Sequence, residues 1–386
     1  MPSILFVMKY PLHRQENLKR KFDGQMAAAR KLGYQAYCIG YDGHGMALVG
    51  EGTREPLLRT ALASLPGYEH TLIFDDLMTA VSQTLKRRKV DVLYLRYMPT
   101  FGAALCAIRA FKAQGGRLVI EYPTYPIAQE NNRFFFRRQV FRYADHVLAK
   151  INPLVDLYAL IGDPCGGTLN GRPAVNIVNG VDAEALPPHL PNESPTTRLL
   201  ALASMSGWHG YDRILRSLAE YRGDADVRLE MVGSDGDGSM EKWRALTQEL
   251  FLQERVTFHG SLYGDALNDQ IAQCDVGVGS LGMYRYGLTR ATTLKLREFM
   301  ARGLPFISAV DDPTLPDAPD WILRVPNDDT PIDMAQVVAF ARRAKALPEL
   351  PQRMRAYAQA HMSWEGTLHR VLEQLNASNV REGMNA

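Results

Sequence analysis

Short apolar runs alternate with helical stretches along most of this chain. In the first half, apolar runs rich in β-branched and aromatic residues predict strands at residues 3–8, 35–41, 91–97, 117–123, 146–151 and 175–181. Stretches with helical character fall between them, at residues 18–33 and 101–116. Strands that alternate with helices are typical of a doubly wound parallel sheet, so the predicted fold class is α/β.

A polar, proline-rich segment at residues 186–197 interrupts this alternation and predicts a domain boundary. The pattern then restarts, with apolar runs at residues 198–205, 227–233, 256–261, 275–281, 305–310 and 321–326. The chain closes with a helical stretch at residues 363–375, and we expect the tail after Asn376 to fray. Two such domains in tandem create a cleft between the carboxyl edges of two sheets, where α/β folds usually bind ligands.

Composition narrows the class of protein. A length of 386 residues is enough for two domains with separate cores, and 46% apolar with 22% charged residues is ordinary for a soluble globular protein. A net charge of +2 gives no reason to expect a nucleic acid partner. The four cysteines are scattered without a CxxC pair, so neither a disulfide framework nor a zinc site is implied. No apolar run approaches the ~20 residues of a spanning helix. We therefore expect a soluble, cytoplasmic protein.

Residues 288–309 contain the clearest candidates for ligand binding. A Thr-rich turn precedes a predicted helix in which Lys295 and Glu298 share one face. Gly303 suits a left-handed C-cap, and Pro305 opens an apolar strand. The helix N-terminus and Lys295 would face a phosphate, while Glu298 would accept hydrogen bonds from sugar hydroxyls. The alternative is that the two side chains form an ion pair on a solvated helix face.

Several motifs in order give this half of the chain a specific resemblance. Residues 231–238 (MVGSDGDG), 254–262 (ERVTFHGSL), 274–281 (CDVGVGSL) and 294–308 (LKLREFMARGLPFIS) together resemble the nucleotide-sugar-binding domain of GT-B glycosyltransferases, near family 4. Residues 176–182 (NIVNGVD) are similar to the family's NGVD element, and residues 363–372 (SWEGTLHRVL) to its closing helix, which crosses back onto the first domain. Residues 206–215 and 121–130 resemble bacterial members from polysaccharide-assembly clusters.

The resemblance implies a GT-B architecture of two Rossmann-like domains facing a cleft. The acceptor-side domain would comprise residues 1–185, with the closing helix and tail at 360–386. The nucleotide-sugar-binding domain would comprise residues 186–359. The resemblance covers most of the chain and is strongest over residues 198–309.

The resemblance also implies donor-binding roles on the predicted helix. Glu298 matches the second Glu of the family's paired-glutamate motif, whose carboxylate takes the ribose hydroxyls of the nucleotide. The first Glu of that pair falls on Arg290, so the usual contact to the transferred sugar is absent or supplied elsewhere. Thr292 and Thr293 occupy the loop whose backbone donors meet the donor phosphates.

The family's phosphate cations are replaced in this chain. Its Arg and Lys align with Ser204 and His209, so the positive charge must come from protonated His209, Arg213 or Lys295. Some cation is required, because cleavage of the sugar–phosphate bond leaves a nucleoside diphosphate with additional negative charge. We therefore predict Lys295 as a catalytic residue and His209, Arg213 and Lys295 as donor-binding residues. Arg213 could instead be solvated on its helix.

The segment 121–130 (EYPTYPIAQE) supplies the predicted acceptor side. It follows a strand end, and its polar side chains could point into the cleft. We predict Glu121 as the carboxylate that contacts the transferred sugar or polarises an acceptor hydroxyl. The predicted acceptor-facing groups are Tyr122, Thr124, Tyr125 and Glu130. Simple loop packing is the alternative for these side chains.

Two further features have competing interpretations. Asp235 and Asp237 spell DxD, a metal motif of the other major glycosyltransferase fold, but their glycine-rich surroundings indicate a turn, so no metal and no cofactor are expected. Basic clusters at residues 86–89 and 133–142 could hold the first domain against the cytoplasmic face of an anionic inner membrane. Alternatively, they are solvated helix faces with a buried aromatic stripe.

The predicted function is a hexosyltransferase-type glycosyltransferase of class EC 2.4. It would move a sugar from a nucleotide-sugar to a bacterial cell-surface polysaccharide or a lipid-linked saccharide. The resemblance implies retention at the anomeric carbon without a metal, with the donor phosphate helping to take the acceptor proton. Two alternatives stay open: a nucleotide-sugar epimerase of the same fold, and a non-catalytic scaffold with a degenerate donor site.

Overall fold

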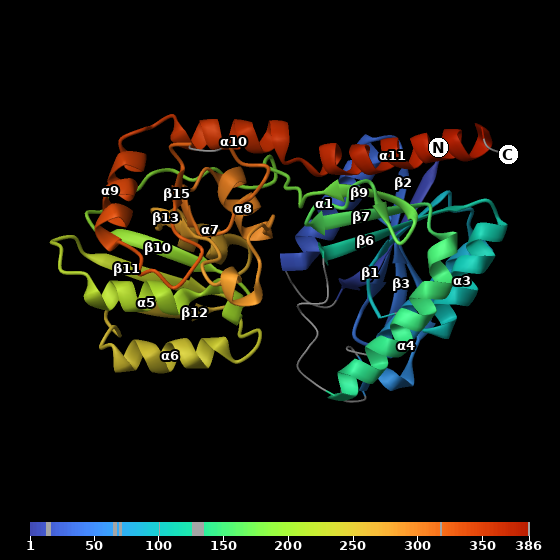
Figure 1. The fold of residues 1–386 in the computed structure, drawn as a ribbon, viewed down its shortest axis with the longest axis horizontal. Helices are drawn as coiled ribbons and strands as arrows, with labels where there is room; N and C mark the ends of the chain where they lie inside the picture. Colours follow the sequence, from blue (N-terminus) through green and yellow to red (C-terminus); the bar gives the residue numbers. More distant parts are fainter. Residues whose placement is uncertain are drawn as a thin grey trace. The chain divides into compact units, whose positions relative to one another are not determined.

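The computed structural model describes residues 1–12, 17–64, 68, 72–99, 101–125, 135–316 and 319–384. By its internal contacts the chain divides into two units. The first unit is Met1–Gly180 with Trp364–Ala386, and the second is Val181–Ser363. Each unit is built on one sheet flanked by helices (Figure 1). The proline-rich segment 186–197 lies inside the second unit.

The first unit contains a nine-stranded sheet in the order β4-β3-β2-β1-β5-β6-β7-β9-β8. The strands from β2 to β9 in this order are parallel, and β3, β4 and β8 are antiparallel additions at the edges. The strand bounds are β1 (Ser3–Pro11), β2 (Gln35–Tyr41), β3 (Gly45–Val49), β4 (Arg54–Arg59), β5 (Val92–Arg96), β6 (Arg117–Tyr125), β7 (Leu157–Gly162), β8 (Thr168–Leu169) and β9 (Arg172–Ile177).

The helices of the first unit cover its sheet. The helix bounds are α1 (Asn17–Lys31), α2 (Ile73–Arg87), α3 (Gly102–Ala113), α4 (Phe135–Ile151) and α11 (Trp364–Met384), with 3₁₀ turns η1 (Ala61–Ser64) and η4 (Asn152–Leu154). Leu5 and Val7 of β1 join the core cluster that includes α2, α3 and α4. The alternating residues Ile4 and Phe6 are also fully buried, as expected for a strand covered on both faces.

The second unit contains a six-stranded parallel sheet in the order β12-β11-β10-β13-β14-β15. Successive residues of β10 enter different cores: Leu199 packs with α5, α6 and α9, and Leu200 with α7, α8 and α10 (Figure 1). The strand bounds are β10 (Thr197–Leu202), β11 (Val227–Val232), β12 (Val256–Gly260), β13 (Val276–Val278), β14 (Phe306–Ser308) and β15 (Ile322–Arg324). The helix bounds are η5 (Gly207–His209), α5 (Tyr211–Glu220), α6 (Ser239–Glu249), α7 (Gly264–Ala272), η6 (Met283–Tyr286), α8 (Leu294–Arg302), α9 (Met334–Lys345) and α10 (Leu350–His361).

Each sheet has a point where the strand order reverses. In the first unit the chain builds outward from β1 through β2 and then returns to place β5 on the other side of β1. In the second unit it builds from β10 through β11 to β12 and then returns to place β13 beside β10. The carboxyl ends of strands at such a switch point diverge into loops on opposite faces, which leaves a crevice for ligands. The second switch point therefore identifies where to look for a site.

The structure confirms the predicted α/β class with two parallel-sheet units and corrects two local predictions. Residues 146–151 are the end of α4 and not a strand, because their buried positions continue the helical spacing of Ala144, Val147 and Ile151. Helix α11 continues to Met384, so the backbone does not fray at Asn376. The strand β7 and the hairpin β3–β4 were not predicted.

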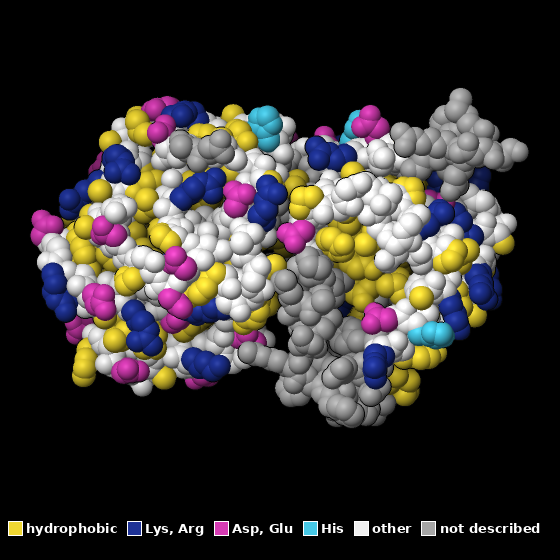
Figure 2. Space-filling view, viewed as in Figure 1, with side chains coloured by type: hydrophobic (Ala, Val, Ile, Leu, Met, Phe, Trp, Pro, Cys, Tyr) yellow, Lys and Arg dark blue, Asp and Glu magenta, His cyan; other side chains and the backbone are white. Residues whose placement is uncertain are grey.

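Charged side chains are distributed over both units. On the face in Figure 2, the described Lys and Arg side chains are interspersed with Asp and Glu side chains. This distribution agrees with the near-neutral net charge of +2. None of the described helices is both long enough and apolar enough to cross a membrane.

Candidate functional site

The connections that leave β10 and β13 meet at the switch point of the second unit. The first contains η5 and His209, and the second contains Ser280 and leads into η6. Gly210 has φ +60°, and a Cβ there would lie 2.5 Å from the backbone nitrogen of Gly282. Only glycine permits both the left-handed backbone and this close approach. The motif at residues 206–215 therefore holds His209 against the carboxyl end of β13.

Lys295, in the first turn of α8, reaches this connection. Its Nζ lies 2.9 Å from His209 Nδ1 and 2.8 Å from the hydroxyl of Tyr211, the first residue of α5. His209 Nδ1 is also 3.2 Å from Ser280 Oγ. Lys295 is 9% exposed and His209 is 7% exposed. The structure thus brings together two residues that the sequence predicted for the donor site, from segments that lie 86 positions apart.

Burial shifts both groups toward their neutral forms. It lowers the pKa of the Lys295 ammonium well below its usual value. Burial likewise lowers the pKa of His209, and the neighbouring Lys295 lowers it further, although a hydrogen bond to the Ser204 carbonyl opposes the shift. Near neutral pH the pair therefore carries less positive charge than an exposed Lys and His would.

Helix α8 has the predicted ends. Thr293 is the N-cap residue with extended φ −85° and ψ 144°, and Gly303 is the C-cap with φ +81°. The Thr293 hydroxyl is buried and makes no hydrogen bond, so the N-terminal backbone N–H groups have no side-chain cap from this residue. Thr292 is buried beside it. A helix N-terminus of this kind carries partial positive charge that favours an anion.

Glu298 lies one turn further along α8. Its Oε1 accepts hydrogen bonds from Arg302 Nη2 at 2.9 Å and Nε at 3.1 Å. Arg302 also donates to Asn268 and is only 2% exposed, so this is not an ion pair on a solvated face. The pair fixes the orientation of the Glu298 carboxylate.

Arg213 has a structural role in this arrangement. Its Nη1 donates to the carbonyl of Leu281 at 2.7 Å and of Pro326 at 3.1 Å, and its Nη2 donates to the carbonyl of Thr330 at 2.7 Å. The guanidinium therefore connects two loops, the one after β13 and the one between β15 and α9. This geometry does not support the prediction of Arg213 as a phosphate ligand, and it equally excludes a solvated Arg213, which is 4% exposed.

The remaining polar motifs of this unit are accounted for by local contacts. Arg290 forms an exposed ion pair with Asp311 at 3.2 Å. Asp235 Oδ1 accepts from the backbone nitrogens of Gly238 and Met240, at the start of α6. Asp237 accepts from Ser239 and from the backbone nitrogen of Gly207 at 3.1 Å. These contacts are those of a helix-capping turn. Among the described residues, no cluster of His, Cys, Asp and Glu could hold a metal ion.

Glu121, the predicted catalytic carboxylate, lies in the interior of the first unit. It is 1% exposed, and it accepts from Lys21 at 2.7 Å, Gln25 at 2.8 Å, Tyr94 at 2.7 Å and Arg96 at 3.3 Å. Burial alone would raise the pKa of Glu121, but Lys21 and Arg96 outweigh it and lower that pKa to about 2. A buried carboxylate with both oxygens occupied is a poor base and has no lone pair directed at a substrate. The predicted direct role is therefore not supported.

Sequence reasoning missed the partners of Glu121. Lys21 donates to Asn179 as well as to Glu121, and burial lowers the pKa of Lys21 to about 8 although Glu121 opposes the shift. With a pKa of about 2 for Glu121 and about 8 for Lys21, both side chains are charged at neutral pH. The positions of Lys21 on α1 and Asn179 after β9 are 158 residues apart. In the sequence, this contact could have been predicted only from Lys21, because it lies on the apolar face of the predicted helix 18–33.

The other predicted acceptor-side residues lie at the end of β6. Tyr122 is buried, and its ring stacks on Tyr97 with centroids 4.6 Å apart, so it belongs to the core. Tyr125 packs edge-on against Tyr122 and is partly buried, as is Thr124. Glu130 lies outside the described residues. Tyr125 and Thr124 therefore stay candidates, whereas packing explains Tyr122.

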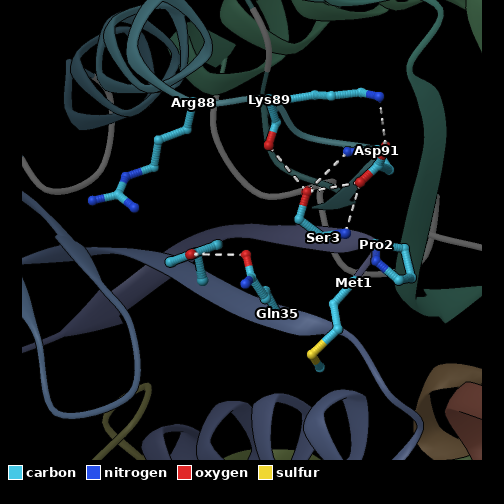
Figure 3. Close-up of a pocket in the computed structure, with 8 residues that line it drawn as sticks. Met1, Pro2, Ser3, Gln35, Arg88, Lys89 and Asp91 are labelled. Atoms are coloured by element: carbon cyan, nitrogen blue, oxygen red, sulfur yellow. Dashed lines mark hydrogen bonds and ion pairs between the residues drawn. The ribbon is translucent and has the colours of Figure 1, made fainter.

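A pocket of about 610 Å³ opens at the other, amino-terminal edge of the first sheet (Figure 3). Met1, Ser3, Gln35, Lys89 and Asp91 line it, and Asp91 accepts two hydrogen bonds from Ser3. Ligands of α/β folds bind at the carboxyl ends of the strands, so this pocket lies at the opposite edge from the predicted site. The basic cluster 86–89 borders this pocket, where Arg88 pairs with Glu55 at 2.9 Å. The side chains of cluster 133–142 lie outside the described residues except for Arg142.

Comparison with known proteins identifies a related family model and solved structures of the same fold. Residues 196–341 match the family model of glycosyl transferases group 1. No curated protein matches the chain. Among solved structures, sucrose-phosphate synthase from Thermosynechococcus elongatus is 16% identical, with a TM-score of 0.70 over 98% of this chain and 100% of the other.

Two further structures share the fold. Anabaena HepE in complex with UDP and glucose is 15% identical, with a TM-score of 0.61 over 98% of this chain and 100% of the other. The catalytic domain of starch synthase IV from Arabidopsis thaliana, bound to ADP and acarbose, is 12% identical, with a TM-score of 0.63 over 98% and 99%. The chain thus has the GT-B fold, and residues 196–341, which match the family model of glycosyl transferases group 1, include Lys295 and His209.

Proposed function

We propose that this protein is a nucleotide-sugar-dependent glycosyltransferase. One observation carries the proposal: the matched group 1 segment, residues 196–341, contains a switch point at which a buried Lys and His converge beside a helix N-terminus. Lys and His side chains beside the backbone N–H groups of a helix N-terminus suit a diphosphate. The UDP- and ADP-bound structures of the same fold support a nucleotide ligand.

In the proposed complex, the donor diphosphate lies at the start of α8. Lys295 and the backbone of Thr292 and Thr293 receive the phosphates, and Glu298 receives the ribose hydroxyls. Lys295 stabilises the charge that develops on the leaving nucleoside diphosphate. The Arg302 ion pair supports this role of Glu298, because it holds the carboxylate in one orientation.

The proposed reaction retains the configuration at the anomeric carbon and needs no metal. The donor phosphate assists removal of the acceptor proton, so no protein base is obligatory. The burial of Glu121 and its pKa of about 2 are compatible with such a reaction, because a base with that pKa would be ineffective. The hydrogen bonds of Asp235 and Asp237 within their turn support the metal-free proposal.

The proposed acceptor is a polysaccharide or a lipid-linked saccharide at the cytoplasmic face of a membrane. The resemblance of residues 206–215 and 121–130 to bacterial polysaccharide-assembly enzymes, near family 4, supports this choice. The first unit would supply the acceptor side, with Thr124 and Tyr125 as its candidate contacts. Peripheral contact through the basic clusters is part of the same proposal.

The test is to incubate the protein with UDP-, GDP- and ADP-sugars, with and without lipid-linked saccharide acceptors. We expect acceptor-dependent release of one nucleoside diphosphate together with an elongated product. Release of the diphosphate or formation of an epimer without an acceptor would indicate an epimerase. Binding of nucleotide without turnover on any acceptor would favour the non-catalytic scaffold.

A further inference from the structure

The contacts of Lys295 and His209 come from neutral groups. Lys295 contacts His209 on η5 and the Tyr211 hydroxyl on α5. His209 contacts the Ser280 hydroxyl after β13 and the Ser204 carbonyl after β10. Among the described residues, no carboxylate contacts either side chain. The nearest acidic residue along α8, Glu298, is paired with Arg302.

Hydrogen-bond directions constrain where the protons lie. The Ser204 carbonyl can only accept, and it is 3.1 Å from His209 Nε2, so that contact requires a proton on Nε2 and leaves Nδ1 to accept from Lys295. The Tyr211 hydroxyl faces the Val278 carbonyl at 3.5 Å and can accept from Lys295 with its lone pair. The Trp208 indole N–H, 3.2 Å from Nε2, could donate there only in the other tautomer. In the tautomer protonated on Nε2, two of the three ammonium donors of Lys295 are occupied, and the third is left for a ligand.

We propose that the Lys295–His209 pair takes up a proton when a nucleoside diphosphate binds, so that ligand binding itself generates the cation that neutralises the diphosphate. This inference rests on the proposed function, because it concerns the same donor site. The proton comes from solvent, the diphosphate oxygens accept from the new N–H, and no covalent bond is made or broken.

The physical reason is the cost of an unpaired buried charge. An ammonium or imidazolium that is more than nine-tenths buried loses its hydration and is stable only beside an opposite charge. Among the described residues, Lys295 and His209 contact hydroxyls, a carbonyl and one another. Burial accordingly lowers the pKa of both groups in the free protein. A diphosphate brings negative charge to the pair and raises both pKa values, which couples binding to protonation.

The arrangement differs from the one that the resemblance implies. The Arg that the resemblance places at Ser204 would keep its charge with or without ligand, since an Arg is always protonated. In this chain the Lys of the site comes from α8 and shares its environment with an imidazole. Donor binding should consequently depend on pH in a way that a permanently charged site would not.

The test is calorimetry with UDP, GDP and ADP at pH 8, in buffers that differ in ionisation enthalpy. At this pH the terminal phosphate, with a pKa of about 6, is already ionised, so the ligand contributes little proton exchange. The dependence of the observed enthalpy on the buffer enthalpy gives the number of protons bound. We expect uptake of about half to one proton and an affinity that falls as the pH rises, by at most about tenfold per unit.

Variants separate the pair from other sources of protons. Lys295→Arg, which is permanently charged, should bind the nucleotide with little or no proton uptake. Lys295→Met should bind it at least about tenfold more weakly and also without uptake. Lys242→Met, at an exposed lysine on α6, is the control and should behave as wild type.

The wild-type measurement is decisive even if a variant fails to fold. Nucleotide binding whose enthalpy is independent of the buffer would overturn the proton uptake and leave the proposed function intact. Uptake by Lys295→Arg of as many protons as wild type would overturn it in the same way. Absence of binding by all three nucleotides would remove the proposed function and this inference together.

Discussion

Replacement of Glu121 distinguishes a structural from a catalytic carboxylate. Glu121→Gln keeps the shape but removes the charge that Lys21 faces at 2.7 Å, with side-chain exposures of 1% and 2%. Breaking a buried pair by removing one partner costs about 3–5 kcal/mol. The lowered pKa of Glu121 agrees in direction, because it shows that the folded protein favours the charged carboxylate, whereas burial of Lys21 lowers the pKa of that ammonium and opposes part of this stabilisation.

The assay is urea unfolding of Glu121→Gln against wild type at pH 7, followed by circular dichroism. Glu55→Gln is the matched control, because Glu55 also pairs with an arginine but its side chain is 37% exposed. We expect a loss of about 3 kcal/mol for Glu121→Gln and a much smaller loss for Glu55→Gln, whose ion pairs are screened by solvent. Adding Lys21→Met to Glu121→Gln should restore part of the loss, because Lys21 then no longer leaves an unpaired buried charge.

The pH dependence has a defined sign. The folded-state pKa of Glu121 lies below its unfolded value of 4.5, so its contribution is complete above pH 4.5 and is lost as the pH falls toward 2. Wild type should therefore lose more stability than Glu121→Gln across this interval. A Glu121→Gln protein that unfolds like wild type but transfers no sugar would refute this reasoning and restore Glu121 as a catalytic residue.

Three further outcomes follow from the site. Glu298→Gln should weaken nucleotide binding by about 1.5–3 kcal/mol, measured by calorimetry, with the thermal midpoint reporting any effect of the lost Arg302 pair; unchanged affinity would remove Glu298 from the site. Asp235→Ala with Asp237→Ala should cost about 1–2 kcal/mol of stability, and EDTA should leave transfer intact; Mg²⁺-restored activity after chelation would contradict this. Arg213→Ala should destabilise the second unit by at least ~2 kcal/mol in urea unfolding, because it leaves three carbonyls in two loops without this donor; a stable variant with impaired nucleotide binding would instead favour the phosphate role.

The regular elements were predictable because their signals are local. The end of α8 at Gly303 follows from the left-handed C-cap, and the buried β10 follows from a continuous apolar run. Residues 146–151 were wrongly predicted as a strand because HVLAKI is apolar enough for one. The helical spacing that identifies these residues as part of a helix begins upstream, in α4. The edge hairpin β3–β4 carries too weak an alternation to be recognised.

The chemistry of the site was less predictable, because it depends on contacts between distant segments. The sequence shows only that Lys295 is a cation near the N-terminus of a helix. That it meets His209 and Tyr211 depends on the strand order that places β13 beside β10. Glu121 was predicted to follow a strand end, but β6 (Arg117–Tyr125) continues through it, and the partners that bury it come from α1 and β5. Polar residues at a sheet edge therefore identify a region, and only the tertiary structure separates a ligand-facing group from a buried support.

The most direct test of the donor site is hydrogen exchange of the protein with and without a bound nucleotide-sugar. We predict added protection at residues 203–213 and 288–300, where η5, the start of α5 and the start of α8 surround Lys295, and loss of that protection in Lys295→Met. Protection confined to the first unit, for instance at the pocket lined by Ser3 and Asp91, would contradict the assignment of the donor site.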